Sequence, residues 1–329
     1  MGRPTRIRPR PTRRFRSTAC RLRTRICSRR RHPDDVRVAD FQDFVPAEDS
    51  LIVERLRQAG AIVVGKTNTP EFGAGSQTFN PVFGATLNPH DRTRTCGGSS
   101  GGAAVALATG MLPIADGSDM GGSLRNPASF CGIVGMRPSP GRVPVCQLTT
   151  AWSTLSVQGP MARSVADVAL LLSAIAGPDA RSPIAIDQPG SLFSQSLRAQ
   201  RQGARIAWWT NLGGIPVERR VRDMVNAQRQ VFESPRLHRR RGGAGLHRLR
   251  RVVFKTLRAL AFFIEASSPP ESRAIAIWVK ETILWEIDRG EAAERQPDIA
   301  SAKTNTRSCI TACVGSWSAT SSSCCRQCR

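Results

Sequence analysis

The sequence contains no tyrosine, only four lysines against 44 arginines, and no uninterrupted apolar stretch long enough to cross a bilayer. The last absence predicts that no helix spans a membrane, since a span needs about 18 or more apolar residues. Hydrophobic residues nevertheless make up 40% of the 329 residues. That share excludes wholesale disorder and leaves enough chain for one large domain or two ordinary ones.

Acidic residues are missing from three basic tracts, which cover residues 1–32, 235–251 and 302–329. These tracts hold 24 arginines and lysines, slightly more than the net charge of +23 for the whole chain. They also hold seven of the ten cysteines. The remaining sequence is close to neutral. The charge is therefore a property of the tracts and not of the part that can build a core, and it does not by itself indicate a nucleic-acid-binding fold.

Outside the tracts, the hydrophobic pattern predicts an α/β fold. Ser164 with Asp167 forms a capping box, and Gly60 and Gly110 are helix stops. Strands that alternate with helices are typical of a sheet covered by helices. The predicted helices are 50–59, 103–109, 165–176, 217–232 and 275–287, and the predicted strands are 61–64, 111–115 and 205–209.

The tracts divide the chain into five predicted segments. We expect an Arg-rich segment over 1–35 that is disordered or out of frame, and an α/β core over 36–234. The core is followed by an Arg-rich interruption over 235–251, a helical continuation over 252–300 and a Ser/Cys-rich tail over 301–329.

Two short motifs match known patterns without their structural context. Gly60–Thr67 fits the phosphate-loop pattern, but its middle residues form a predicted strand and Pro70 follows where a helix should run. Gly98–Gly102 fits the nucleophile elbow G-x-S-x-G. A Ser-His-Asp hydrolase needs a later histidine, and only His238 and His247 follow, both in the second tract. We therefore interpret the first motif as no phosphate-binding loop and the second as no nucleophile elbow of a Ser-His-Asp hydrolase.

Four cysteines in the last tract have spacing compatible with a zinc site: Cys309, Cys313, Cys325 and Cys328. No predicted element flanks them, unlike the cysteines of zinc modules. We therefore expect no metal at these cysteines.

The strongest match is long. Residues 97–140 contain two glycine-serine clusters 24 residues apart, and the second leads into Arg125, Asn126 and Pro127. Together with Val45–Gly75 upstream, and continuing to about Ala176, this stretch resembles the amidase signature family. The resemblance implies a mixed β-sheet core covered by helices on both faces, incomplete where the tracts interrupt it. It also implies hydrolysis of a carboxamide C–N bond to an acid and ammonia or an amine, without a cofactor.

The same resemblance assigns the site residues. Ser123 would be the nucleophile that forms an acyl-enzyme, and Ser99, on a cis peptide bond, would carry its proton. Ser100 and Asp119 would support the loop by hydrogen bonds, and Arg125 would anchor it. The oxyanion would be bound by the backbone N–H groups of Met120, Gly121, Gly122 and Ser123.

The sequence departs from the family at the general base. The family uses a lysine in a short apolar segment upstream of the residues that match Asp49–Thr67, but residues 1–65 contain no lysine. Lys66 matches a different family position, and we interpret it as structural. Arginine stays protonated and cannot replace a lysine base. We therefore expect weak or absent turnover. One hypothesis is that frame errors replaced the base-bearing segment, an internal segment and the C-terminal part.

Three alternatives remain open. One is the glutamine-hydrolysing subunit of a tRNA-dependent amidotransferase, although Phe72–Gly84 looks closer to the general amidases. Another is a basic protein that binds nucleic acid nonspecifically through its tracts. A third treats residues 1–32 as a transit peptide, against which three prolines count. The expected partner is a small amide, with no specific nucleic acid and no membrane. We expect a cytoplasmic location, and the oligomeric state stays open, with a homodimer as one option.

Overall fold

The computed structural model describes residues 21–24, 48–146, 152–196, 205–208, 216–233 and 238–240, together with isolated positions between 281 and 289. The chain forms two compact units. One comprises residues 1–195 and 267–284, and the other comprises residues 196–266 and 285–329.

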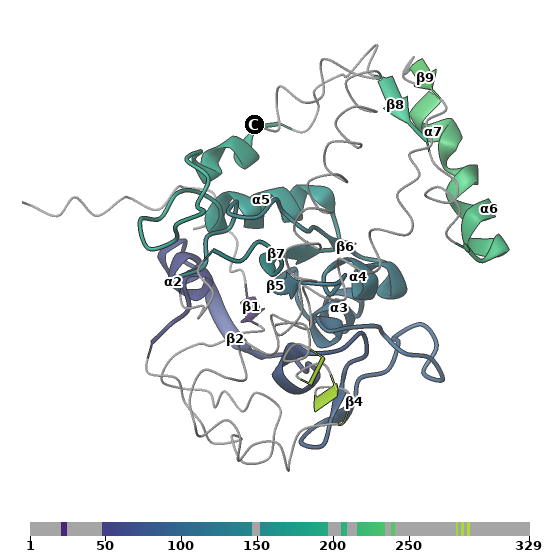
Figure 1. Cartoon of the computed structure of the whole chain (residues 1–329), viewed down its shortest axis with the longest axis horizontal. Helices are drawn as coiled ribbons and strands as arrows, with labels where there is room; N and C mark the ends of the chain where they lie inside the picture. Colours follow the sequence, from purple (N-terminus) through teal and green to yellow (C-terminus); the bar gives the residue numbers. More distant parts are fainter. Residues whose placement is uncertain are drawn as a thin grey trace, which may run out of the picture. The chain divides into compact units, whose positions relative to one another are not determined.

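The first unit is built around a five-stranded sheet with the order β2-β1-β5-β7-β6 (Figure 1). Strand β1 runs parallel to β2 and β5, whereas β7 runs antiparallel to β5 and β6. The sheet is therefore mixed, as predicted. Its strands are β1 (Arg21–Thr24), β2 (Ile62–Lys66), β5 (Ile114–Asp119), β6 (Val134–Gly135) and β7 (Val157–Ala162).

Strand β1 comes from the first basic tract, where the sequence pattern predicted no element. Its backbone pairs Arg21 with Ile62 and Thr24 with Lys66 on one side, and Arg23 with Ala115 on the other. A strand between two neighbours is stabilised by ladder hydrogen bonds on both edges, which depend on backbone position and not on residue type. The prediction that segment 1–35 has no regular structure is therefore wrong for these residues.

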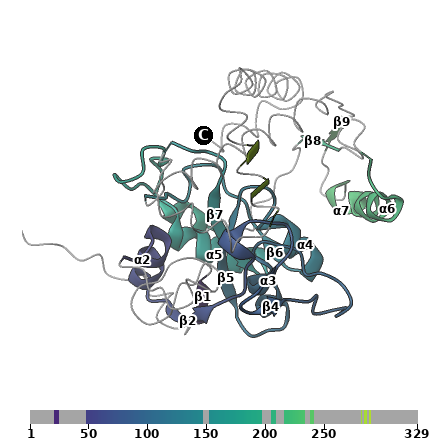
Figure 2. The ribbon, with the colours of Figure 1, turned by 60° about the horizontal axis from the view of Figure 1, so that its bottom comes forward.

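Helices cover both faces of the sheet, as predicted. Ile114 and Ala162 are directly paired and belong to the core cluster under α2 (Leu51–Gln58) and α5 (Val165–Ile175). The next pair along the strands, Ala115 and Met161, belongs to a second cluster. Since successive residues of a strand point to opposite faces, the two clusters lie on opposite sides. The second is formed with α3 (Gly101–Ala108) and α4 (Arg125–Cys131), which lie side by side in Figure 2.

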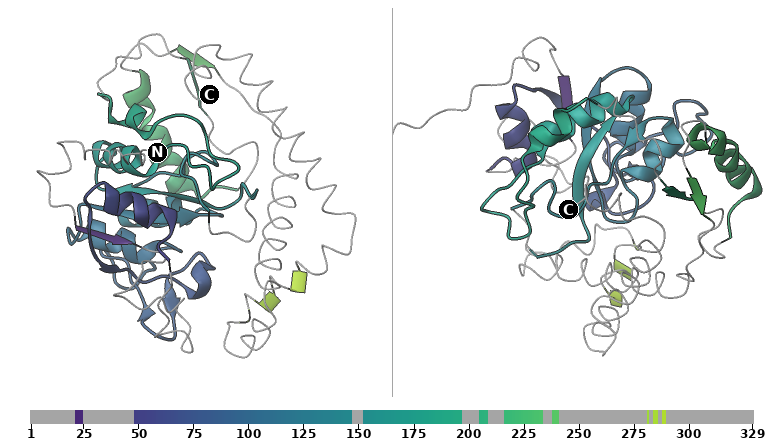
Figure 3. Two further views of the ribbon diagram at one scale, coloured as in Figure 1. Left: turned by 90° about the vertical axis from the view of Figure 1, so that its left-hand side faces the viewer. Right: turned by 90° about the horizontal axis from the view of Figure 1, so that it is seen from above.

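The ends of the helices follow the predicted signals, and one predicted strand begins later than expected. The Ser164 side chain accepts a hydrogen bond from the Asp167 N–H at the start of α5, which lies along the sheet in Figure 3. Gly60 and Gly110 have φ values of 83° and 75° after α2 and α3, a left-handed conformation that favours glycine. The strand predicted over 111–115 begins only at Ile114. Pro113 before it has no N–H for a ladder hydrogen bond.

Short elements complete the description. In the first unit these are η2 (Glu71–Gly73), β3 (Phe79–Asn80), β4 (Gly84–Ala85) and η3 (Gly190–Ser194). The second unit contains β8 (Arg205–Ala207), parallel to β9 (His238–Arg240), with α6 (Arg219–Ala227) and α7 (Arg229–Glu233). The predicted helix over 217–232 is thus present in two pieces. The helix predicted over 275–287 lies largely outside the described residues, and the tail over 301–329 lies wholly outside them. In the described part of the chain, no helix is long and apolar enough to cross a membrane.

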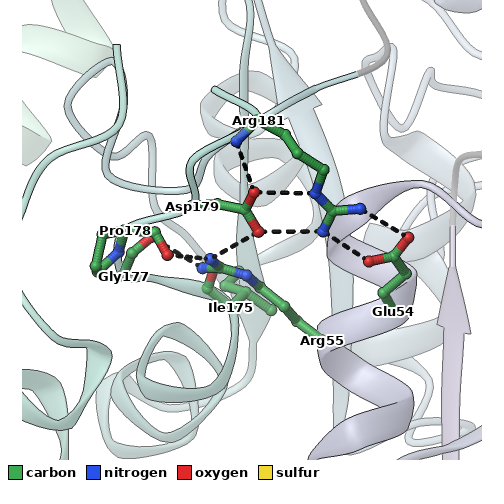
Figure 4. A network of polar contacts seen from close by, with 7 residues as sticks. All are labelled: Glu54, Arg55, Ile175, Gly177, Pro178, Asp179 and Arg181. Atoms are coloured by element: carbon green, nitrogen blue, oxygen red, sulfur yellow. Dashed lines mark hydrogen bonds and ion pairs between the residues drawn. The ribbon is translucent and has the colours of Figure 1, made fainter. Parts of the chain in front are cut away.

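An arginine of α2 fixes the C-terminal end of α5 (Figure 4). The Arg55 guanidinium donates to the carbonyl oxygens of Ile175 at 2.8 Å, Gly177 at 3.0 Å and Pro178 at 2.8 Å. It also lies 3.7 Å from the Asp179 carboxylate. Carbonyl oxygens at the end of a helix lack intrahelical partners and carry partial negative charge, so a cation there is favourable.

Replacing Arg55 with methionine is expected to lower the free energy of unfolding by about 2 kcal/mol, because three carbonyl oxygens lose a charged donor. The change is measured as a lower urea midpoint. Arg57→Met is the control, since Arg57 makes a surface ion pair with Asp49 and is 46% exposed. Its loss should cost less than about 0.5 kcal/mol. Equal losses in the two variants would contradict this role of Arg55.

Candidate active site

The first glycine-serine cluster forms a tight loop that leads into α3. The peptide bond between Gly98 and Ser99 is cis, as the resemblance implied, and both Ser99 and Ser100 are buried. The hydroxyl of Thr78 donates to the Gly97 carbonyl at 2.9 Å and accepts from the Gly101 N–H at 3.1 Å. Thr78 therefore holds the loop on both sides of Ser99. The sequence analysis missed Thr78, because it lies 19 residues away from its partner Gly97 and in no motif.

The glycines of this loop are required by close packing. A side chain on Gly98 would meet the backbone of Gln77 at 2.9 Å, and one on Gly102 would meet the backbone of Asn68 at 2.5 Å. The Gly102 N–H donates to the Asn68 carbonyl at 3.2 Å. The segment that follows β2 therefore lies directly against the start of α3, and this contact fixes the position of the serine loop.

The second cluster forms the loop between β5 and α4, and it contains Ser123. Its centre is the Asp119 carboxylate, whose side chain is 0% exposed. This carboxylate accepts from the N–H groups of Gly122 at 2.8 Å and Leu124 at 3.2 Å, the residues on either side of Ser123. Arg125 donates to it from Nε at 2.9 Å and from Nη2 at 3.0 Å. The supporting role predicted for Asp119 thus has a physical basis.

Charge and hydrogen bonding decide the ionisation of Asp119. Burial alone would raise the pKa of its carboxyl group. This effect is outweighed by the hydrogen bond from Arg125, by the N–H groups of Gly122 and Leu124 and by the positive charge of Arg125. Together they hold the pKa of Asp119 below its usual value. The same contact raises the pKa of Arg125, through its hydrogen bond to Asp119. The pair is therefore fully charged at neutral pH.

One of the four predicted oxyanion donors is used elsewhere. The Gly122 N–H is committed to the Asp119 carboxylate at 2.8 Å and so does not face a substrate in this arrangement. Gly122 has φ 119°, and its missing side chain leaves room for the Asn126 amide, which a Cβ would meet at 2.8 Å. Here glycine serves the turn rather than the oxyanion. Met120, Gly121 and Ser123 remain as the predicted donors.

The two serine loops are joined directly. The Ser100 N–H donates to the Ser123 carbonyl at 3.2 Å, and the Ser100 hydroxyl lies 3.4 Å from the Ser118 carbonyl of β5. Ser99, next to Ser100, is 1% exposed, whereas Ser123 is partly exposed. The structure therefore packs the loop of the predicted nucleophile against the loop of the predicted bridging serine, through the backbone contact between Ser100 and Ser123.

A second arginine reaches Asp119 from another part of the fold. Arg137 lies just after β6, and its Nη1 donates both to the Asp119 carbonyl and, at 3.1 Å, to the Asp119 carboxylate. Its Nη2 donates to the Leu155 carbonyl at 2.9 Å. Sequence reasoning did not find Arg137, because the contact joins residues 18 positions apart and no spacing rule links them.

Two buried cysteines, Cys96 and Cys131, belong to the core beside α3 and α4. Burial raises the pKa of Cys96, and burial with the proximity of Cys96 raises that of Cys131 to about 12. At neutral pH both are thiols and not nucleophilic thiolates. Among the described residues there is no group of three or more His, Cys, Asp or Glu side chains that could hold a metal ion. Cys309, Cys313, Cys325 and Cys328 lie outside those residues.

The mixed sheet, its helices on both faces and the paired serine loops define the class of amidase-signature enzymes. A bacterial aryl acylamidase of that class has a TM-score of 0.77 and 25% sequence identity, covering 88% of this chain and 62% of its own. A 6-aminohexanoate cyclic dimer hydrolase shares the fold, with a TM-score of 0.78 at 24% identity over 94% of this chain and 68% of its own. The sequence model of the Amidase family matches residues 38–238, and the chain belongs to this family.

Curated relatives are components of an amidotransferase. The chain is 46% identical over 184 residues to a glutamyl-tRNA(Gln) amidotransferase subunit of Syntrophobacter fumaroxidans. The matched residues are 56% of this chain and 36% of the relative. It is 51% identical over 149 residues to the corresponding protein of Thermus thermophilus, and here the matched residues are 45% of this chain and 32% of the relative. The chain thus spans about a third of the length of these relatives. These identities support the amidotransferase alternative, although the segment Phe72–Gly84 is interpreted as closer to the general amidases.

Proposed function

We propose that this chain is the core of an amide hydrolase that cleaves a carboxamide C–N bond through an acyl-enzyme on Ser123. The observation that carries the proposal is the junction of the two serine loops, in which the Ser100 N–H binds the Ser123 carbonyl at 3.2 Å. This contact lies inside the segment that matches the Amidase family.

The proposed reaction has two steps. The Ser123 oxygen forms a bond with the amide carbon while its proton passes to Ser99, which in the same step passes its own hydroxyl proton on to a base. The C–N bond then breaks, the nitrogen takes the proton back through Ser99 and leaves as ammonia or an amine, and an ester on Ser123 remains. Water hydrolyses this ester and releases the carboxylic acid. The negative oxygen formed in each step would be bound by the N–H groups of Met120, Gly121 and Ser123.

The base that receives the proton from Ser99 is the incomplete part of the site. No lysine precedes Lys66 in this sequence, and β1 occupies the place in the sheet between β2 and β5. We propose that β1 stands where the family carries its base-bearing segment, and that its arginines cannot take up a proton. The proposed consequence is that the oxyanion loop is assembled but amide hydrolysis by the chain is slow. Out-of-frame origin of the tracts stays a hypothesis.

A second candidate substrate is glutamine. The relatives from Syntrophobacter and Thermus are both named as components of a glutamyl-tRNA(Gln) amidotransferase, at 46% and 51% identity. Under this candidate the side-chain amide of glutamine would be the carboxamide, and further amidotransferase components would be the partners. Ammonia release from glutamine, compared with release from acetamide and benzamide, distinguishes the two candidates.

A fluorophosphonate probe tests the proposed nucleophile. The expected result is slow formation of one covalent adduct, located on the peptide containing Ser123, because the fluoride leaves as the serine oxygen bonds to phosphorus. Ser123→Ala should abolish the adduct. Ser139→Ala is the matched control, since Ser139 is an exposed loop serine, and it should label at the wild-type rate. Labelling that persists in Ser123→Ala would overturn the proposed function.

A further inference from the structure

Arg137 contacts a backbone carbonyl of the oxyanion loop in addition to a carboxylate. Its Nη1 donates to the Asp119 carbonyl and lies 3.1 Å from the Asp119 carboxylate, and its side chain is 24% exposed. The Asp119 carbonyl belongs to the same peptide group as the N–H of Met120. This N–H is one of the three remaining predicted oxyanion donors.

The planarity of the peptide group transmits the effect of this contact. In a trans peptide the carbonyl and the N–H point in opposite directions. A guanidinium that holds the Asp119 carbonyl on one side therefore fixes the direction of the Met120 N–H on the other. Donation to the carbonyl also polarises the group and strengthens its N–H as a donor, as in chains of cooperative hydrogen bonds.

Arg125 cannot supply the same constraint. It contacts Asp119 only through the carboxylate and lies six positions away, at the start of α4. It therefore stabilises the internal shape of the loop. Arg137 comes from the segment after β6 and also binds the Leu155 carbonyl at 2.9 Å. Leu155 lies just before β7, whose Val157 pairs with Asp119. Arg137 thus ties the loop to the ends of three strands.

We propose that Arg137 is a positioning residue for the oxyanion site, acting by orienting and polarising the peptide group between Asp119 and Met120. The inference rests on the proposed function, because it needs an oxyanion at Ser123. It assigns Arg137 no contact with the reacting atoms.

Binding of two probes by the full chain tests this role. Phenylboronic acid forms a tetrahedral adduct with an active-site serine and places an oxygen where the oxyanion develops, whereas benzamide is planar. In Arg137→Met the affinity for phenylboronic acid should fall about 10- to 100-fold, part of the effect of removing an oxyanion donor. The affinity for benzamide should change less than about 3-fold, since ground-state binding does not use the oxyanion contact. Arg137→Lys should restore part of the loss, because an ammonium can still donate to the carbonyl.

Arg163→Met is the matched control. Arg163 also binds two carbonyls, those of Leu107 at 2.9 Å and Leu112 at 2.6 Å, but outside the two serine loops. An equal loss for both probes in Arg137→Met, or the same boronate loss in Arg163→Met, would show a merely structural role and overturn the inference. Unchanged boronate affinity in Arg137→Met would overturn it as well. If the wild-type chain binds phenylboronic acid no better than Ser123→Ala does, the proposed function itself fails.

Discussion

Asp119→Asn is expected to lower the free energy of unfolding by about 3 kcal/mol, because it removes the charge that neutralises two arginines at a buried position. The Asp119 side chain is 0% exposed, whereas Arg125 is 55% exposed and Arg137 is 24% exposed. Arg125 can regain water after the change, which limits the cost to the lower end of the range for a broken buried pair. Urea unfolding followed by circular dichroism measures the loss.

Asp91→Asn is the matched control for this change. Asp91 also accepts from a backbone N–H, that of Thr93 at 3.0 Å, and from an arginine, Arg94 at 2.9 Å, but it lies at the surface. Its substitution should leave the urea midpoint nearly unchanged, because exposed ion pairs contribute little. A similar loss in both variants would contradict the assignment of Asp119 as the buried centre of the loop. If Asp119→Asn does not fold, Arg125→Met reports on the same contact with a smaller loss.

The pH dependence of stability gives a second measurement of the same contact. The folded-state pKa of Asp119 is lowered, so its contribution is present above the unfolded value of about 3.9 and is lost as the pH falls through the folded value. The wild-type chain should therefore lose stability in acid more steeply than Asp119→Asn does. Parallel pH profiles for the two proteins would contradict a depressed pKa at this position.

A small primary amine is expected to accelerate amide hydrolysis by the wild-type chain, because it would supply the base that we propose is missing. A general base contributes about 10²–10⁴-fold to such reactions, which sets the size of the deficit and the upper limit of rescue. Benzamide hydrolysis is followed by ammonia release at constant pH with increasing ethylamine. The rate should rise with the concentration of the free amine, and therefore with pH at fixed total amine.

Two variants decide the origin of the rescue. Ser123→Ala should show no acceleration, since the amine then has no hydroxyl to deprotonate. Lys66→Met should keep the rescued rate, because we interpret Lys66 as structural and its amine is buried at the end of β2. Fast hydrolysis without added amine that disappears in Lys66→Met would instead identify Lys66 as the base and contradict the proposed deficit.

Much of the fold followed from local sequence signals. The capping pair Ser164 and Asp167, and the glycines after α2 and α3, lie where the pattern placed them. These signals depend on neighbours along the chain, which a sequence displays directly. Strand β1 could not be predicted in this way. Its residues alternate charge with small and apolar side chains, and only the backbone edges of β2 and β5 define its place.

For the candidate site, the sequence by itself determined which residues carry the proposed chemistry, since the two glycine-serine clusters and the family match are properties of residue type and order. Tertiary structure alone decided how those residues are held. It committed the Gly122 N–H to Asp119 at 2.8 Å, and it brought Thr78 and Arg137 to the two loops from distant segments. The physical reason is that hydrogen-bond partners across a sheet or between loops are fixed by packing and strand register, which no spacing in the sequence encodes.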